Sequence, residues 1–263
     1  MTDDNNYLDL LFIASRLESM EETIISKLID RAQFAVNATV YESGKSGFAG
    51  ELTRSLFDLR LYYHEHMDAL FGRFFVPEER PFTRDLPGPK RDVTLPDTGL
   101  CIDDLEKVNF TAPVRSAYMD LVGKICLDGD DGQYGSSVEH DVYAVQAIAR
   151  RIHFGAFYVA ESKFRNNPGT FRRLVETRDA ETMESILTRP EVEEQIIERV
   201  HRKTIETQRG VKRELRNVID AEVIVQFYRD TVIPLTKEGE VTYLLHRCPA
   251  TSGSPAAQYK FNP

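Results

Sequence analysis

A group of cationic side chains lies inside an apolar stretch at residues 149–164, where it could bind an anion. Arg151 and Lys163 are surrounded in the sequence mainly by alanine, isoleucine and phenylalanine. A buried cation needs an acidic partner or an anionic ligand. The alternative is that both side chains pair with carboxylates of the core or extend their charged ends into solvent.

Carboxylates and a hydroxyl further along the chain could complete such a site. Glu193 and Glu194 follow Pro190 in the first turn of an expected helix, where the helix dipole alone favours acidic residues. Thr236 and Glu240 are four residues apart and therefore share one helical face, as many surface pairs do. These positions are candidates for contacts with a polar ligand, and a structural role is the alternative for each.

Other classes of reactive site are missing from the sequence. The histidines do not recur with the spacing of zinc ligands, and His64 and His66 would lie on different faces of one helix. No glycine-rich phosphate loop opens a helix, and no arrangement of a nucleophile with its base is visible. The cysteines Cys101, Cys126 and Cys248 form no CxxC pair, which argues against a disulfide framework and a cysteine zinc site and favours a reducing compartment. We therefore expect no metal.

The overall charge excludes some partners. The 263 residues contain 33 Lys and Arg against 42 Asp and Glu, a formal net charge of −9. Such a chain repels nucleic acid and anionic lipid, so neither is an expected partner. No apolar run reaches the roughly 18 residues of a membrane span, and the acidic start MTDDNNYLDLL does not resemble a secretory signal. We expect a cytoplasmic protein.

The elements that must position the candidate residues are helices. Apolar residues recur at steps of three and four, and no convincing alternation with period two is present. Half of the twelve prolines lie between residues 77 and 113, which predicts an irregular segment that crosses the surface of the domain. The expected helices cover residues 10–34, 51–75 and 136–164 (the last opened by a Ser136–Glu139 capping box), a short stretch after Pro168, a stretch opened by Pro190, and a final helix that Asp220 caps and Pro234 bends.

This pattern predicts an all-α fold. We expect residues 1–263 to form a single helical-bundle domain with a Pro-rich crossing segment. The tail at 249–263 has no periodicity and is expected to be peripheral.

Several strings resemble the all-helical chorismate mutases of the fungal and plant type. The resemblance spans nearly the whole chain in the family's order, and its most specific parts are RRIHFG at 150–155 and VIPLTKE at 232–238. The other matching strings lie at 20–25, 29–34, 73–74, 81–82, 134–136, 156–164, 192–194 and 239–245.

This resemblance implies an enzyme that rearranges chorismate to prephenate in phenylalanine and tyrosine biosynthesis. The reaction is unimolecular and needs no nucleophile, metal or cofactor, but it needs groups that hold a dicarboxylate and stabilise negative charge on the ether oxygen. By motif, Arg151 would bind one carboxylate. Lys163 would contact the other carboxylate and the ether oxygen.

The same comparison implies roles for residues of the last two helices. Glu193 and the backbone near Val192 would hold the substrate hydroxyl. Thr236 would assist carboxylate binding. Glu240 would donate a hydrogen bond to the ether oxygen while protonated, and burial should raise its pKa.

Two departures from the family affect carboxylate binding. The family has an arginine six residues before the position of Met20, where this chain has Ala14. Arg16 is nearby but roughly 200° around the helix from that position. Arg189 replaces a small amide residue that often lies four positions before the family's glutamate, here Glu193. We therefore predict Arg189, with Arg16 as the other candidate, as a replacement cation at the substrate.

The third departure concerns helix register. The family separates its arginine and lysine by eleven residues, whereas Arg151 and Lys163 are twelve apart. In a regular helix the extra residue would turn Lys163 away by about 100°. We therefore predict a one-residue π-bulge between Gly155 and Val159.

The family also binds tryptophan and tyrosine at a regulatory site in its dimer interface. The matching residues are Arg73, Gly135 and Ser136, which implies a homodimer with an aromatic amino-acid effector. Inhibition by tyrosine is less strongly implied than tryptophan binding, because three further positions of the family pattern differ here. These positions are Gly72, Glu139 and Asp220.

A second function remains open at this stage. The chain could be a non-catalytic homologue that keeps the fold and the aromatic-ligand site and acts as a binding or interaction protein. The geometry of the cations distinguishes the two functions, because an enzyme needs at least two cations that converge on one dicarboxylate.

Overall fold

Helices make up the fold in the computed structural model, which describes residues 7–102, 104–212 and 214–248. No strand is present in these ranges, which agrees with the all-α prediction. The longer helices are α1 (Leu10–Arg31), α2 (Leu56–Leu70), α3 (Thr111–Ile125), α4 (Tyr134–Phe154), α5 (Ala160–Asn166), α6 (Pro168–Thr177), α7 (Ala180–Leu187), α8 (Pro190–Thr207), α9 (Ala221–Phe227) and α10 (Ile233–Leu245). Short 3-10 helices cover Ala38–Tyr41, Arg73–Phe75 and Leu105–Val108, and π-helical segments cover Gly155–Val159 and Tyr228–Val232.

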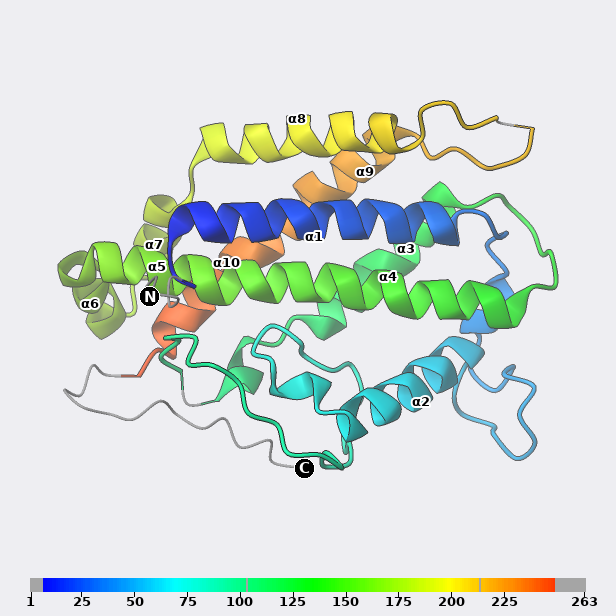
Figure 1. Cartoon of the computed structure of the whole chain (residues 1–263), viewed down its shortest axis with the longest axis horizontal. Coiled ribbons are helices and arrows are strands. Elements are labelled where there is room, and N and C mark those ends of the chain that lie inside the picture. The colour runs from blue at the N-terminus through cyan, green and yellow to red at the C-terminus, as the bar shows by residue number, and fades with distance from the viewer. Residues whose placement is uncertain (1–6, 103, 213, 249–263) are drawn as a thin grey trace.

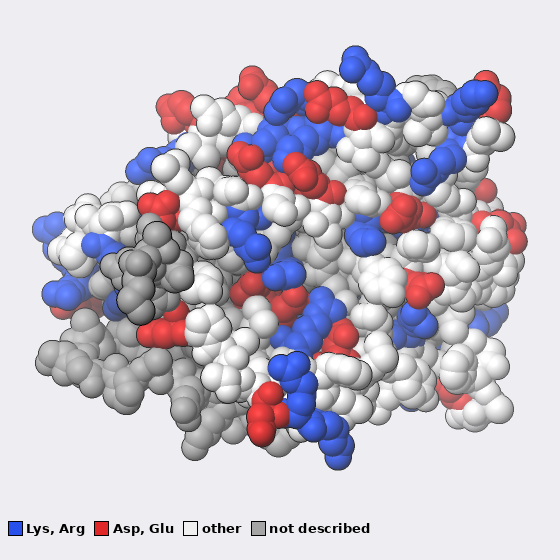
Figure 2. All heavy atoms as spheres, viewed as in Figure 1, with Lys and Arg blue, Asp and Glu red and all other residues white. Residues whose placement is uncertain are grey.

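The two longest helices, α1 and α4, lie side by side through the middle of the molecule (Figure 1). Helix α8 covers α1 on one side, and α2 packs on α4 from the other. The buried residues of α1 recur every three or four positions, for example Ile13, Met20, Ile24 and Leu28, and form the face that packs on α4. Side chains of both charges are interspersed over this side of the molecule (Figure 2).

A buried ion pair joins the end of α1 to α4. Arg31 Nε donates to Asp141 Oδ1 at 2.5 Å, and both side chains are fully buried. The hydroxyls of Tyr41 and Tyr118 donate to the same carboxylate at 2.8 and 2.7 Å. Because three donors satisfy this buried carboxylate, the cluster links the end of α1 to α4 at one position.

Several predicted helix limits are wrong. Helix α2 begins after Ser55, which forms a capping box with Asp58, and so starts later and ends earlier than 51–75. Helix α1 ends at Arg31. Helix α4 starts at Tyr134, before Ser136, and the expected capping box is absent because Ser136 already lies inside the helix.

Two helices were not predicted. Pro113 belongs to the first turn of α3, where a proline is tolerated because that backbone N–H has no intrahelical partner. Helix α7 lies in the sequence between the predicted helix after Pro168 and the predicted helix that starts at Pro190. The described part of 76–104 contains no helix, as expected for the crossing segment. The tail at 249–263 lies outside the described residues.

The predicted cap of the final helix is confirmed, and a π-helical segment that was not predicted divides this helix before Pro234. Asp220 accepts a hydrogen bond from the Glu222 amide at the start of α9. The π-helical segment Tyr228–Val232 then precedes Pro234, which has no amide to donate into the helical ladder.

Candidate active site

The predicted π-bulge is confirmed. Residues Gly155–Val159 are π-helical, between the regular helices α4 and α5. Such a segment accommodates one extra residue without ending the helix. Within it, the ring of Tyr158 stacks on Phe154 with centroids 4.5 Å apart. The extra residue is therefore absorbed before Lys163.

Four of the predicted site residues meet between the long helix and α10. Arg151 Nη1 donates to Thr236 Oγ1 at 2.9 Å, and Lys163 Nζ donates to Glu240 Oε2 at 3.0 Å. Arg151 and Glu240 are only 2% and 5% exposed. Lys163 Nζ also donates to the carbonyl of Leu187 at 2.8 Å, so the end of α7 helps to hold it. Two cations thus lie on one face, each paired with a group of α10.

Two glycines allow α10 to approach this face closely. A Cβ atom on Gly155 would lie 2.6 Å from Cγ2 of Thr236, and one on Gly239 would lie 2.5 Å from Cβ of Ala156. Both distances are too short for real carbon contacts. The small residues at these positions therefore set the distance between α10 and the π segment, and with it the Arg151–Thr236 hydrogen bond.

Burial and the neighbouring cations act in opposite directions on the pKa of Glu240, with a net rise. Burial raises the pKa of Glu240, while the positive charges of Lys163, Arg151 and Lys237 oppose that rise. A protonated carboxyl can donate a hydrogen bond, whereas a carboxylate only accepts. The arrangement can therefore present an ammonium and a carboxyl donor to one oxygen atom.

A buried carboxylate on α1 balances Arg151. Glu21 is fully buried, and its Oε1 lies 3.8 Å from Arg151 Nη2. Arg199 of α8 binds the same carboxylate with Nε–Oε2 and Nη2–Oε1 distances of 2.7 and 2.9 Å. The hydroxyl of Tyr228 is buried nearby without a partner among the described residues, and its pKa is raised by burial and by Glu21. From the sequence, no role was predicted for Glu21. A charged residue on the apolar face of a helix indicates a buried charge that needs a partner, and this pattern could have identified it.

The structure places Glu193 at the edge of this cluster. Its Oε1 lies 3.2 Å from Nζ of Lys237, the residue after Thr236. Val192 is 46% exposed. Lys237 is a further cation near Glu240 that sequence reasoning missed, although it belongs to the VIPLTKE string.

The two predicted replacement cations are not part of the cluster. Arg16 and Arg189 are exposed, and neither side chain forms a hydrogen bond or ion pair with the described residues. Arg189 caps α8 with its backbone, whose carbonyl accepts from the Glu193 amide at 3.1 Å. Ala14 is exposed, one turn before Leu17, which packs near Gly155. The face of α1 that carries Ala14 therefore borders the site.

The predicted effector residues are separated within the chain. Arg73 donates to Asp68 at 2.6 Å, to Glu79 at 2.9 Å and to Gln146 of α4 at 2.7 Å. Gly135 and Ser136 are exposed in the first turn of α4. Eleven residues from Gly135 to Gln146 correspond to roughly 16 Å along that helix. One chain therefore does not bring these residues together.

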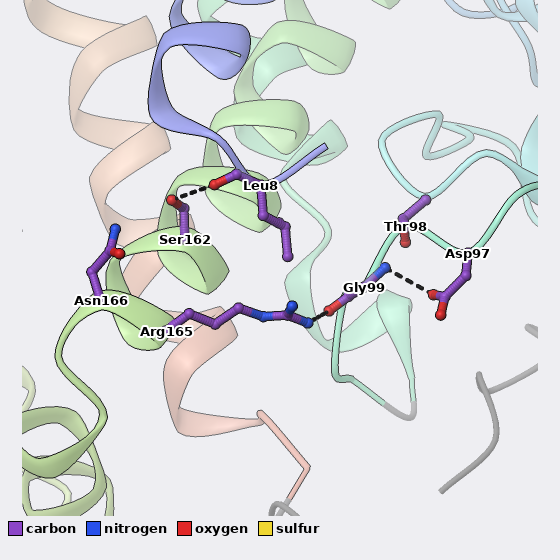
Figure 3. Close-up of a pocket in the computed structure, with 7 residues that line it drawn as sticks. All are labelled: Leu8, Asp97, Thr98, Gly99, Ser162, Arg165 and Asn166. Carbon is purple, nitrogen blue, oxygen red and sulfur yellow. Dashed lines mark hydrogen bonds between the residues drawn. The ribbon is translucent and has the colours of Figure 1, made fainter. Parts of the chain in front are cut away.

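A cavity of about 370 Å³ lies beside α5 (Figure 3), and Arg151 is not among the residues that line it. Ser162 and Arg165 line it from the helix, and Asp97 and Gly99 line it from the crossing segment. Arg165 donates to the Gly99 carbonyl and to Glu161 Oε1, the latter at 2.9 Å. The Arg165 guanidinium is therefore already hydrogen-bonded within the protein, and we assign no ligand to this cavity.

Two further searches concern metals and membranes. Within the described ranges, no group of three or more His, Cys, Asp or Glu side chains lies close enough together to hold a metal ion. None of the helices described is long and apolar enough to cross a membrane.

Known proteins resemble this chain along nearly its whole length. It is 36% identical over 250 residues to the chorismate mutase of Schizosaccharomyces pombe, and the aligned region covers 92% of this chain and 98% of that protein. It is 32% identical over 258 residues to chorismate mutase 2 of Petunia hybrida, and this alignment covers 93% of this chain and 94% of that protein. The Aro7p chorismate mutase of Candida albicans in complex with L-Trp superposes with a TM-score of 0.84 at 33% identity, over 92% of each chain. No family model matches the chain. From these similarities, the chain belongs to the chorismate mutases of fungi and plants.

Proposed function

We propose that this enzyme rearranges chorismate to prephenate between α4, α5 and α10, as a step of phenylalanine and tyrosine biosynthesis. The observation that carries this proposal is the pair of cations, Arg151 and Lys163, on one face of the long helix and in contact with Thr236 and Glu240. In the reaction the ether C–O bond breaks while a new C–C bond forms within the same molecule. The site needs to hold the reactive conformer and to stabilise charge on the departing oxygen.

The contacts support a division of roles. Arg151 is buried, is held by Thr236 and Glu21, and can form two parallel hydrogen bonds to a substrate carboxylate. Lys163 Nζ and Glu240 Oε2 lie 3.0 Å apart. Once Glu240 is protonated, both groups can donate to the ether oxygen. We assign the substrate hydroxyl to Glu193 and the backbone at Val192.

The second substrate carboxylate needs another cation, because Ala14 stands where the family has an arginine. Arg189 is our first candidate, because it lies one turn before Glu193, and Arg16 is the other. Both side chains are exposed and unpaired among the described residues, so each is available to a ligand. Lys237 is a third candidate, and it would have to leave Glu193 to contact the substrate.

Consumption of chorismate by the purified protein, measured as loss of its absorbance, tests this function. Arg151→Ala and Lys163→Ala should each lower kcat/KM by at least about 10²-fold, since each removes charge-assisted hydrogen bonds in a desolvated site. Arg172→Ala is the matched control, because Arg172 is exposed and lies outside the cluster. A well-folded wild-type protein that does not consume chorismate would favour the non-catalytic homologue.

We further propose that the enzyme is a homodimer and binds tryptophan or another aromatic amino acid at the subunit interface. Helix α2 and its C-cap residue expose a stripe of apolar side chains, Tyr63, Met67 and Phe71, at 54%, 51% and 68% exposure. A second subunit on this stripe could bring Arg73 to Gly135 and Ser136 of its partner, which lie roughly 16 Å from the Arg73 contact in one chain. The relative from Candida albicans was solved with L-Trp.

Light scattering and calorimetry test these proposals. The wild type should have the mass of a dimer, and Met67→Glu should shift it to a monomer. Titration with tryptophan should show binding that Arg73→Ala removes.

We also propose that residues 1–263 form one domain, supported by a continuous cluster of buried side chains from α1 to α10, and that the enzyme is cytoplasmic.

A further inference from the structure

Two cysteines lie opposite each other where the crossing segment meets the chain after α10. Ile102 and Arg247 form an isolated antiparallel bridge. Next to it, the amide of Cys248 donates to the carbonyl of Cys101 at 2.9 Å. The Sγ atom of Cys101 lies 3.7 Å from the carbonyl oxygen of Cys248.

We infer that Cys101 and Cys248 form a reversible intramolecular disulfide. Residues that exchange both backbone hydrogen bonds across an antiparallel pair have Cα atoms about 5.5 Å apart and side chains on one face. Cys101 and Cys248 make one of these two bonds. Disulfides span Cα separations of about 4.4–6.8 Å. From this pairing we expect a Cα separation within the range that a disulfide requires.

Closing the bond requires only a small movement. The Cβ atoms of such a pair are about 4.5–5.5 Å apart and must approach to about 3.5–4.5 Å. Both cysteines lie outside the helices and are partly exposed residues, so this shift breaks no helical ladder. Cys126 differs, because it contacts Arg31 and burial raises its pKa to about 11.

The oxidant we propose is a small disulfide such as glutathione disulfide. The thiolate of one cysteine attacks a glutathione sulfur, which forms a mixed disulfide and releases one glutathione thiolate. The second cysteine thiolate then attacks the protein sulfur of that mixed disulfide and releases the other glutathione. The two protein thiols are oxidised, one glutathione disulfide is reduced to two glutathiones, and the two protons go to the released thiolates.

This bond would reinforce a junction that polar contacts already make. The amide of Cys101 donates to the hydroxyl of Tyr243 in α10, and that hydroxyl donates to Glu161 of α5 at 2.9 Å. Arg247 Nε binds the same carboxylate at 2.7 Å. The disulfide would therefore covalently join the two segments that meet beside α5. Glu161, which Tyr243 and Arg247 contact there, is two residues before Lys163 in the chain.

The main expected consequence is resistance to unfolding. The two cysteines are 147 positions apart, so the bond closes a large loop in the unfolded chain. A disulfide across such a loop should raise the melting temperature by about 5–10 °C.

Thermal melts and intact mass of the full chain, equilibrated in reduced glutathione or in glutathione disulfide, test the inference. We expect the oxidised protein to lose the mass of two hydrogen atoms, remain a single chain on a non-reducing gel, and melt at the higher temperature. Cys101→Ser and Cys248→Ser should each abolish the difference between the two conditions. Cys126→Ser is the matched control and should keep it.

Each variant is compared with itself in the reduced and the oxidised condition. A change in stability that the substitution alone causes therefore cancels from the difference in melting temperature. Glutathione adducts without the loss of two hydrogens would overturn the inference. So would a bond between chains, or a redox-dependent melting temperature that persists in Cys101→Ser. None of these outcomes depends on whether the protein turns over chorismate.

Discussion

Insertion of one alanine between Val159 and Ala160 should separate Lys163 from Glu240. One residue turns an α-helix by about 100°, and at the ~5–6 Å radius of side chains this moves the lysine by roughly 8 Å. The present distance between Lys163 Nζ and Glu240 Oε2 is 3.0 Å. The π segment Gly155–Val159 already absorbs one extra residue and is packed against α10, so it has no room for a second.

Initial rates of chorismate consumption measure the effect. A misplacement of about 1 Å can cost 10²-fold in rate, so the insertion should lower kcat/KM by at least about 10²-fold. Circular dichroism checks that the helices remain.

Deletion of Tyr158 is the matched variant. It restores a spacing of eleven between Arg151 and Lys163, which a regular helix places within about 20° of one face. This variant should keep more activity than the insertion, although it loses the stacking of Tyr158 on Phe154. Wild-type activity in the insertion variant would refute our account of the register. Equal losses in both variants would show that restoring the spacing of eleven does not by itself preserve activity.

Three further predictions concern the same site. Turnover should fall as pH rises through the raised pKa of Glu240, because the carboxyl stops donating, and Glu240→Gln should flatten this fall; an unchanged profile would remove Glu240 from the ether-oxygen role. Gly155→Ala should lower stability in urea titrations by about 1–2 kcal/mol, because the clash of its methyl group with Thr236 outweighs the helical preference of alanine; a more stable variant would contradict the close approach. Arg189→Ala should raise KM roughly tenfold or more with little change in kcat, and Ala14→Arg should lower KM; a normal Arg189→Ala with a strongly improved Ala14→Arg would exclude compensation by Arg189.

Local pattern alone was enough to predict much of this protein. The periodicity of α1, the proline at the start of α8 and the twelve-residue spacing of Arg151 and Lys163 each depend on the geometry of a single helix. The π segment was predicted by comparing this spacing with the eleven residues of the family that the chain resembles, because only a bulge returns Lys163 to the face of Arg151. Motif order along the chain was enough to identify the family.

Only the tertiary structure decided which side chains pair. Glu21 and Arg199 are 178 positions apart, and no local pattern connects them until α8 packs on α1. The position of Pro113 was misread because a proline in a first helical turn and one in a loop satisfy the same local rule. The opposition of Cys101 and Cys248 likewise depends on where the crossing segment meets the end of α10. These pairings arise from long-range packing, in which burial removes water and each charged group must take the partner that the fold places beside it.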